Sequence, residues 1–124
     1  MAQTVTATIA GKQLVVGDGI RTENVKPTTA TAYKRGDLVA VSAANVATHA
    51  ADAESWQAII AVDVSAAQAT AHAAAGLEIP VYVQGAFDVD VVTLNGTALN
   101  AGQKTTARAK ALTNKIELRK VVGG

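Results

Sequence analysis

The stretch from residue 77 to residue 94 constrains the fold most, because it carries the longest β pattern of the chain. Ile79, Val81 and Val83 fall on one side of an extended segment, and Phe87 continues the apolar pattern further on. A period of two in β-branched residues is typical of a strand with one buried face. Gly85 interrupts the register and predicts a bulge or a close backbone approach. The chain therefore has to build a β-sheet.

Shorter patterns place further elements around this strand. Residues 38–41, residues 57–62 and the apolar positions from 116 to 121 predict strands, and residues 103–112 predict a helix. Ser65 predicts the cap of a short helical turn that reaches Ala69, with residues 70–76 as a loop. The fold class that we expect is β-rich α+β, with one short helix near the C-terminus.

Size and composition predict one domain with a modest core. The chain has 124 residues, of which 49% are hydrophobic but only 3% aromatic, and 27 are alanine. Two cores would each be too small to be stable, and small side chains bury little area each. We therefore expect a partner subunit or surface to add stability. The residues expected in the core are Trp56, Ile60, Val81, Val83 and Phe87.

The N-terminal residues have the pattern of a separate strand. Between residues 2 and 9, threonines alternate with apolar residues, and the glycines at positions 17 and 19 predict a turn. We expect residues 1–20 to form a flexible arm and residues 21–124 to form the domain. A strand-competent arm suits binding by strand addition, through Thr4, Val5, Thr6, Ala7, Thr8 and Ile9.

Composition excludes several classes of protein. The chain has no cysteine, so it has no disulfide framework and no thiolate metal site. Its apolar runs fall far short of the roughly 20 residues that a membrane span needs, so no membrane partner is expected. Six of the eleven basic side chains follow residue 97, with one acidic residue among them. They lack interleaved aromatic residues, so we expect no nucleic-acid partner.

No group of residues predicts catalysis or metal binding. His49 and His72 lie in alanine-rich stretches and are expected to be exposed loop residues, and only Asp52 could join His49 as a ligand. Asp88 and Asp90 are expected on the solvent face of a strand. Residues 34–37 have the glycine and aspartate of a turn. We therefore expect neither an enzyme nor a cofactor.

The order of these elements resembles that of the lambda-like head decoration proteins of tailed bacteriophages. A strand over residues 38–41 precedes the run 56–64, WQAIIAVDV. The run 79–87, IPVYVQGAF, follows an alanine-rich spacer, and an Asn-Gly turn, a helix and a last strand complete the order. Ala58 stands where the family pattern has glycine, and residues 1–37 are longer than the equivalent part of the best-known member.

The resemblance implies a fold, a role and a set of partners. The fold would be a small β-barrel or tulip. The role would be capsid decoration, in which homotrimers bind the major capsid protein at three-fold sites of the expanded head and stabilise it against internal DNA pressure. The arm would add a strand to the capsid protein. The protein would be made in the host cytoplasm and end on the virion exterior. The alternative is a ligand- or carbohydrate-binding β module displayed on a particle surface.

Overall fold

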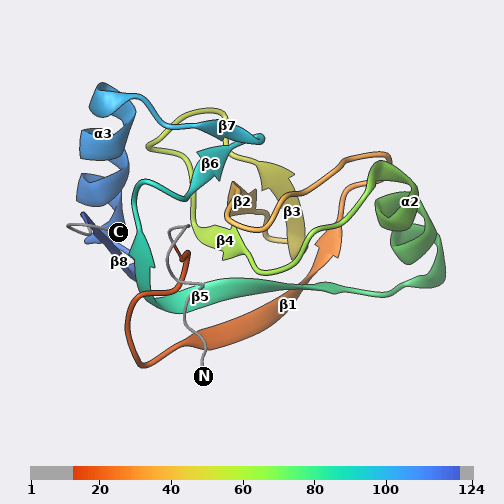
Figure 1. Cartoon of the computed structure of the whole chain (residues 1–124). Coiled ribbons are helices and arrows are strands. Elements are labelled where there is room, and N and C mark those ends of the chain that lie inside the picture. The colour runs from red at the N-terminus through yellow and green to blue at the C-terminus, as the bar shows by residue number, and fades with distance from the viewer. Residues whose placement is uncertain (1–12, 121–124) are drawn as a thin grey trace, which may run out of the picture.

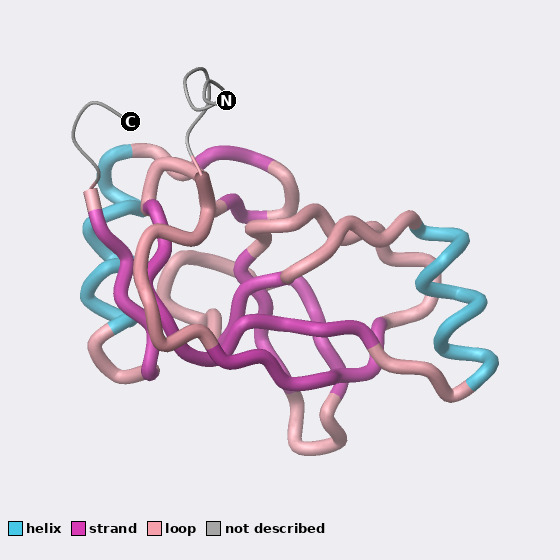
Figure 2. The backbone as a smooth tube through the Cα atoms, turned by 60° about the horizontal axis from the view of Figure 1, so that its bottom comes forward, coloured by secondary structure: helices cyan, strands magenta, loops and turns pink. Residues whose placement is uncertain are grey.

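The computed structural model of the protein describes residues 13–120, and its course is drawn in Figures 1 and 2. Within these residues it is a β-rich α+β domain with helices at two opposite ends. The strands are β1 (Arg21–Pro27), β2 (Leu38–Val41), β3 (Val46–His49), β4 (Ala58–Ile60), β5 (Ile79–Asp88), β6 (Thr93–Leu94), β7 (Thr97–Ala98) and β8 (Lys115–Arg119), and the helices are α2 (Ala66–Ala75) and α3 (Ala101–Ala111).

Strand pairing organises the domain around β5. The main sheet has the order β1-β3-β2-β4-β5-β8. Because β1 also pairs with β5, the first five strands of this order form a closed ring of pairings. The pairings β1–β3 and β5–β8 are parallel, and the others in this sheet are antiparallel. β6 and β7 form a separate hairpin. The expected strands around residues 38–41, 57–62 and 77–94 are thus present, whereas β1 and β3 were not predicted.

Gly85 lets β5 change partners half-way along its length. Its φ of 136° lies in the region that favours glycine, and a Cβ there would meet Ile20 Cδ1 at 2.4 Å. The close neighbour is thus a side chain rather than backbone, and the register between β1 and β5 shifts between Arg21 and Thr22, so the irregularity expected near this glycine is a bulge in the pairing. Before Gly85, β5 pairs with β1 and β4. From Gln84 onward β5 pairs with β8, and Val15 bridges to Phe87.

The packed domain begins before residue 21. Leu14 is 2% exposed, and its carbonyl accepts the Asp88 N–H at 2.9 Å. The Val16 N–H donates to the Ala86 carbonyl at 3.0 Å. Residues 14–16 therefore extend the edge of β5 as part of the core, which corrects the expected boundary between an arm of residues 1–20 and a domain of residues 21–124. The arm residues 4–9 lie outside the described residues.

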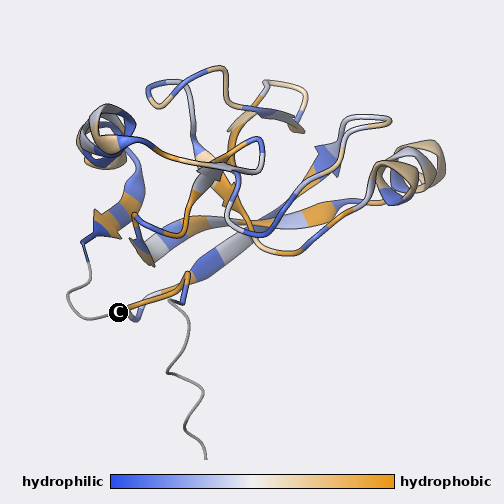
Figure 3. Ribbon diagram, turned by 45° about the horizontal axis from the view of Figure 1, so that its top comes forward, coloured by the Kyte–Doolittle hydropathy of each residue, from blue (hydrophilic) through white to orange (hydrophobic). Residues whose placement is uncertain are grey.

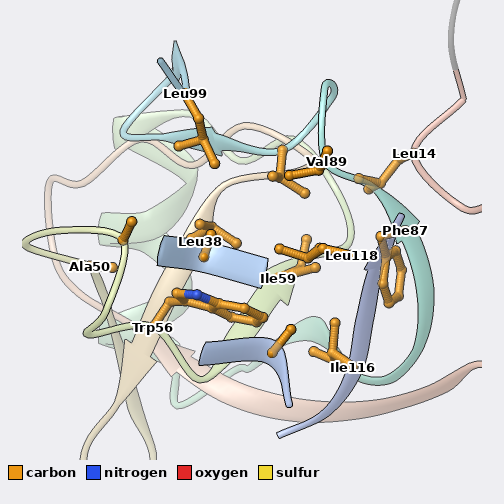
Figure 4. Packing of buried hydrophobic residues seen from close by; sticks show 14 residues of the cluster. Leu14, Leu38, Ala50, Trp56, Ile59, Phe87, Val89, Leu99, Ile116 and Leu118 are labelled. Atoms are coloured by element: carbon orange, nitrogen blue, oxygen red, sulfur yellow. The ribbon is translucent and has the colours of Figure 1, made fainter. Parts of the chain in front are cut away.

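The core consists of two clusters. One surrounds Trp56 and Phe87 and includes residues of β8, as Figure 4 shows, together with residues of α3. The other lies between β1, β2, β5 and α2 and includes Ile60 and Val81. All four of these residues are buried, as expected. Val83 was also expected there, but it is only partly buried at the edge of the second cluster. In Figure 3 the most hydrophobic residues lie on the strands between the two helices.

Two helices form within residues 13–120, where one short helix was expected near the C-terminus. Ser65 accepts the Gln68 N–H and so caps α2 as predicted, but the helix continues through Thr70 to Ala75. Gly76 ends it with a φ of 71°. The expected loop over residues 70–76 is therefore wrong. Asn100 caps α3, which begins at Ala101, two residues before the helix predicted over residues 103–112. Both caps are reciprocal capping boxes with a glutamine at the third helical position.

Candidate functional site

The arm joins the domain beside the C-terminal end of β5. Asp88, the last residue of β5, is bonded to Leu14 on one side and is paired with Arg119 of β8 on the other. The described chain therefore starts and finishes at the same end of β5, with Gln13 and Lys120 as its last described residues. A segment that extends from Gln13 begins on the side of β5 that β1 occupies further along.

The turn over residues 34–37 is held by a buried aspartate. Asp37 is 1% exposed, and its Oδ2 accepts the Lys34 N–H at 2.8 Å. Its Oδ1 accepts the Gly96 N–H at 2.8 Å and the Thr93 hydroxyl. These bonds tie the turn to the β6–β7 hairpin. The turn interpretation is therefore confirmed, and the Asp37 carboxylate is occupied by structural donors.

His49 is not an exposed loop residue. It belongs to β3, and its side chain is only 14% exposed. Its Nε2 lies 2.7 Å from the Ala32 carbonyl, so this nitrogen carries a proton, and its ring packs on Tyr33 with 5.1 Å between centroids. Its Nδ1 lies 3.8 Å from Asp37 Oδ2. The expectation failed because β3 was not recognised in an alanine-rich stretch.

His72 and the other candidate ligands do not form a metal site. His72 lies in α2, partly buried, with Nδ1 2.8 Å from the Gln68 carbonyl. The Asp52 carboxylate accepts the Glu54 N–H and the Ser55 hydroxyl within its own loop. Across residues 13–120 no three histidine, aspartate or glutamate side chains gather closely enough to hold a metal ion.

Asp88 and Asp90 do not share a solvent face. β5 ends at Asp88, whose side chain is 0% exposed and whose Oδ1 accepts the Asp90 N–H at 2.8 Å. Asp90 lies beyond the strand and forms ion pairs with Lys104 at 2.7 Å and Lys120 at 2.9 Å. The expectation was wrong because the alternation of apolar residues continues past the end of the strand. The two carboxylates stabilise the turn and its attachment to α3 and β8.

The basic C-terminal side chains are largely engaged within the protein. Besides the two lysines bound to Asp90, Arg108 donates from Nε to the Leu118 carbonyl at 3.1 Å. Arg119 pairs with Glu117 at 3.0 Å. The Arg119 guanidinium holds the pKa of Glu117 below its usual range, so this carboxylate is charged at neutral pH and is a poor base. Of the six, Arg108, Lys110 and Lys115 form no ion pair within residues 13–120.

A groove of about 780 Å³ lies between the C-terminal part of α3, β8 and the loop at Asp18 and Gly19. Leu112, 86% exposed, stands at its border. Its lining also includes small residues such as Ala86, the Glu117–Arg119 pair, and polar side chains such as Gln84 and Arg108. This groove was not predicted, because it joins three separated segments. It offers apolar contact and charge rather than a pair of groups suited to acid–base chemistry.

All four aromatic rings of the chain lie inside the domain or against it. Trp56, Phe87 and Tyr33 are buried. Tyr82 packs on Phe87 with 5.0 Å between ring centroids, and the Arg35 guanidinium lies over the Tyr82 ring in a cation–π contact. No ring is left as an exposed platform of the kind that stacks on sugars.

No protein-family model matches the chain, and no curated protein shows significant similarity to it. Among residues 13–120, none of the helices has the length and apolar character to cross a membrane.

Proposed function

We propose that this protein is a capsid decoration protein of a tailed bacteriophage, which binds as trimers at three-fold sites of the expanded head and stabilises it. It would be made in the host cytoplasm and act on the virion exterior, with the major capsid protein as its partner. The observation that carries the proposal is the order of elements from β2 to β8. The strands β2, β4 and β5, followed by α3 and β8 as a final helix–strand pair, come in the order that the resemblance implies, with β3 and α2 inserted between them.

The ring of strand pairing supports a small barrel as the finer description of the fold. β1 pairs with β3 at Lys26 and Pro27 and with β5 at residues 21–25, so the strands can enclose the second core cluster. A closed sheet leaves few exposed strand edges through which copies of the protein could aggregate. This property suits a protein that has to remain dispersed until it finds its capsid.

The engagement of the polar side chains supports a structural role rather than a catalytic one. Asp37 and Asp90, which could have served as acids or bases, accept several donors each within the domain. Exposed apolar side chains, in contrast, are available for contacts between subunits. Leu112 is 86% exposed and Leu77 is 54% exposed. A trimer that covered such residues would gain about 25 cal/mol per Å² of apolar area.

A carbohydrate-binding module is less well supported. Sugar sites need exposed rings for stacking, and the four rings of this chain are used in packing.

Co-sedimentation with expanded, undecorated heads of the phage that encodes the chain tests the proposal. The full chain should pellet with the heads, and a variant that lacks residues 2–12 should stay in the supernatant. This truncation keeps Leu14, so its unfolding transition should match that of the full chain. A variant that lacks residues 121–124 serves as the control and should pellet. Failure of the full chain to pellet contradicts decoration, whereas binding of the truncated chain contradicts only the role of the arm.

A further inference from the structure

The β6–β7 hairpin (Figure 1) turns on the one Asn-Gly pair of the chain, Asn95 and Gly96. Both residues are exposed, and their φ values are 49° and 81°. Two successive positive φ values in a two-residue loop are those of a type I′ turn, which prefers asparagine followed by glycine. The same pair is the one most prone to deamidation, because glycine has no side chain to hinder attack by its nitrogen. A reactive pair therefore stands at an exposed hairpin tip.

Deamidation of this pair needs no reactant besides water. The Gly96 nitrogen loses its proton to solvent base and attacks Asn95 Cγ, which closes a succinimide ring. The Cγ–Nδ2 bond breaks, and Nδ2 takes a proton from water and leaves as ammonia. Water then opens the ring at either carbonyl, so that aspartate or isoaspartate stands at position 95. Isoaspartate carries the chain through Cγ and so adds a methylene group to the backbone.

The turn holds the reacting atoms apart. At the first central residue of a type I′ turn, ψ is about +30°. This rotation puts the Gly96 nitrogen nearly opposite Asn95 Cβ about the Cα–C bond, whereas a five-membered ring needs the two atoms eclipsed. The Asn95 backbone therefore has to leave the turn conformation before the ring can close.

A buried carboxylate fixes the Gly96 nitrogen in the unreactive position. The Gly96 N–H donates to Asp37 Oδ1 at 2.8 Å, and the Thr93 hydroxyl donates to the same oxygen. Asp37 is 1% exposed, and its Oδ2 accepts the Lys34 N–H at 2.8 Å, so the carboxylate is anchored to the turn over residues 34–37. Rotation of Asn95 toward the reactive geometry breaks the bond between Gly96 and Asp37.

We infer that Asn95 is a deamidation site that folding protects, and that Asp37 is the residue that protects it. In the folded protein Asn95 reacts only while the hairpin is locally open, and in an unfolded molecule it reacts freely. Isoaspartate lengthens the two-residue loop, so β6 and β7 lose their register, and either product adds a negative charge near Asp37. A molecule that has opened is thereby marked permanently. This chemistry is independent of capsid binding.

Peptide mapping by mass spectrometry measures the reaction at Asn95. The folded chain and the chain unfolded in guanidinium chloride are incubated in the same mildly alkaline buffer. The folded chain should react at least about tenfold more slowly, because opening breaks a hydrogen bond to a charged acceptor. Asn45 is the internal control, since it is also exposed, with a φ of 64°, but the branched Val46 follows it, and it should stay intact in both samples. Equal rates at Asn95 in both samples would overturn the inference.

Asp37→Ala separates the effect of the carboxylate from that of the turn. In the folded variant Asn95 should deamidate about tenfold faster or more, because one hydrogen bond to a charged group is lost. The amide signals of β5 report whether the variant is folded. Hydrogen exchange of the Gly96 amide in the wild type needs no variant, and it should be slow although this residue is exposed, because the same opening frees the amide. Unchanged or slower deamidation in the folded variant, or fast exchange at Gly96, would contradict the role of Asp37.

Discussion

At the scale of single residues, Trp56 is the largest side chain of the core. It is 0% exposed, and its indole Nε1 has no hydrogen-bond partner within the described residues. We expect Trp56→Ala to lower the free energy of unfolding by about 3–5 kcal/mol, the usual cost of removing a buried large ring. Trp56→Phe should cost much less, because it keeps a ring and removes the unpaired N–H. Urea denaturation measures both, and a loss below about 1 kcal/mol for the alanine variant would contradict the packing.

Asp52 gives the stability a defined dependence on pH. The Ser55 hydroxyl and then the Glu54 N–H bond its carboxylate, and these bonds hold the pKa of Asp52 below its usual range. The unfolded chain therefore takes up this proton first as the pH falls, so the stabilisation is present above about pH 4 and is lost below it. The difference in unfolding free energy between the wild type and Asp52→Asn should shrink between neutral pH and about pH 3. A difference that stays constant would show that the bonds do not form in solution.

The residues that the sequence could not place are those whose role depends on where a strand ends. Phe87 and Trp56 were predicted in the core from their apolar strand patterns, and both are there. Asp88 has the sequence context of an exposed position, because apolar residues flank it on both sides. Its burial follows from the turn that begins directly after it and from the segment at Leu14 that covers it. Neither feature leaves a local pattern.

At the scale of elements, the sequence predicted the strands that are buried on a regular face and missed those that are not. β5 and β8 alternate clearly, and both were expected. In β1 only Val25 and Pro27 are buried, since the first half of the strand extends beyond the core. α2 was predicted too short because it has no apolar stripe. An alanine helix needs none, and α2 buries only Ala69.

That weak attachment of α2 makes its cap decisive for local stability. Ser65→Ala removes the acceptor of the Gln68 N–H and should destabilise the helix by about 1 kcal/mol. Because Ala69 is the only buried residue of α2, hydrogen exchange of the α2 amides should accelerate while β5 amides change little. Asn100→Ala in α3 is the matched variant. α3 buries Ala107 and Ala111, so its loss of a cap should instead lower global stability. Equal effects of both variants on β5 would contradict this difference.

At the scale of the whole molecule, the distribution of charge predicts that the protein does not bind nucleic acid. The six basic side chains that follow residue 97 would suit phosphate if they were free. Four of them are engaged, namely Lys104 and Lys120 on Asp90, Arg119 on Glu117, and Arg108 on a carbonyl. This pairing could not be predicted from the sequence, because Asp90 lies far from its partners along the chain.

Binding to a capsid and binding to DNA therefore differ in their response to salt. If all six cations met phosphate, affinity would fall about a thousandfold between about 50 and 200 mM salt, at a log–log slope of about −0.9 per phosphate. Strand addition and apolar contacts depend little on salt, because backbone hydrogen bonds and buried area supply their energy. We expect capsid binding to vary less than about tenfold over this range, and duplex DNA to stay unbound at about micromolar protein. Titrations of heads and of labelled DNA at both salt concentrations measure this. Tight DNA binding that collapses as salt rises would show that the ion pairs at Asp90 and Glu117 open in solution, and would make the basic segment the functional surface.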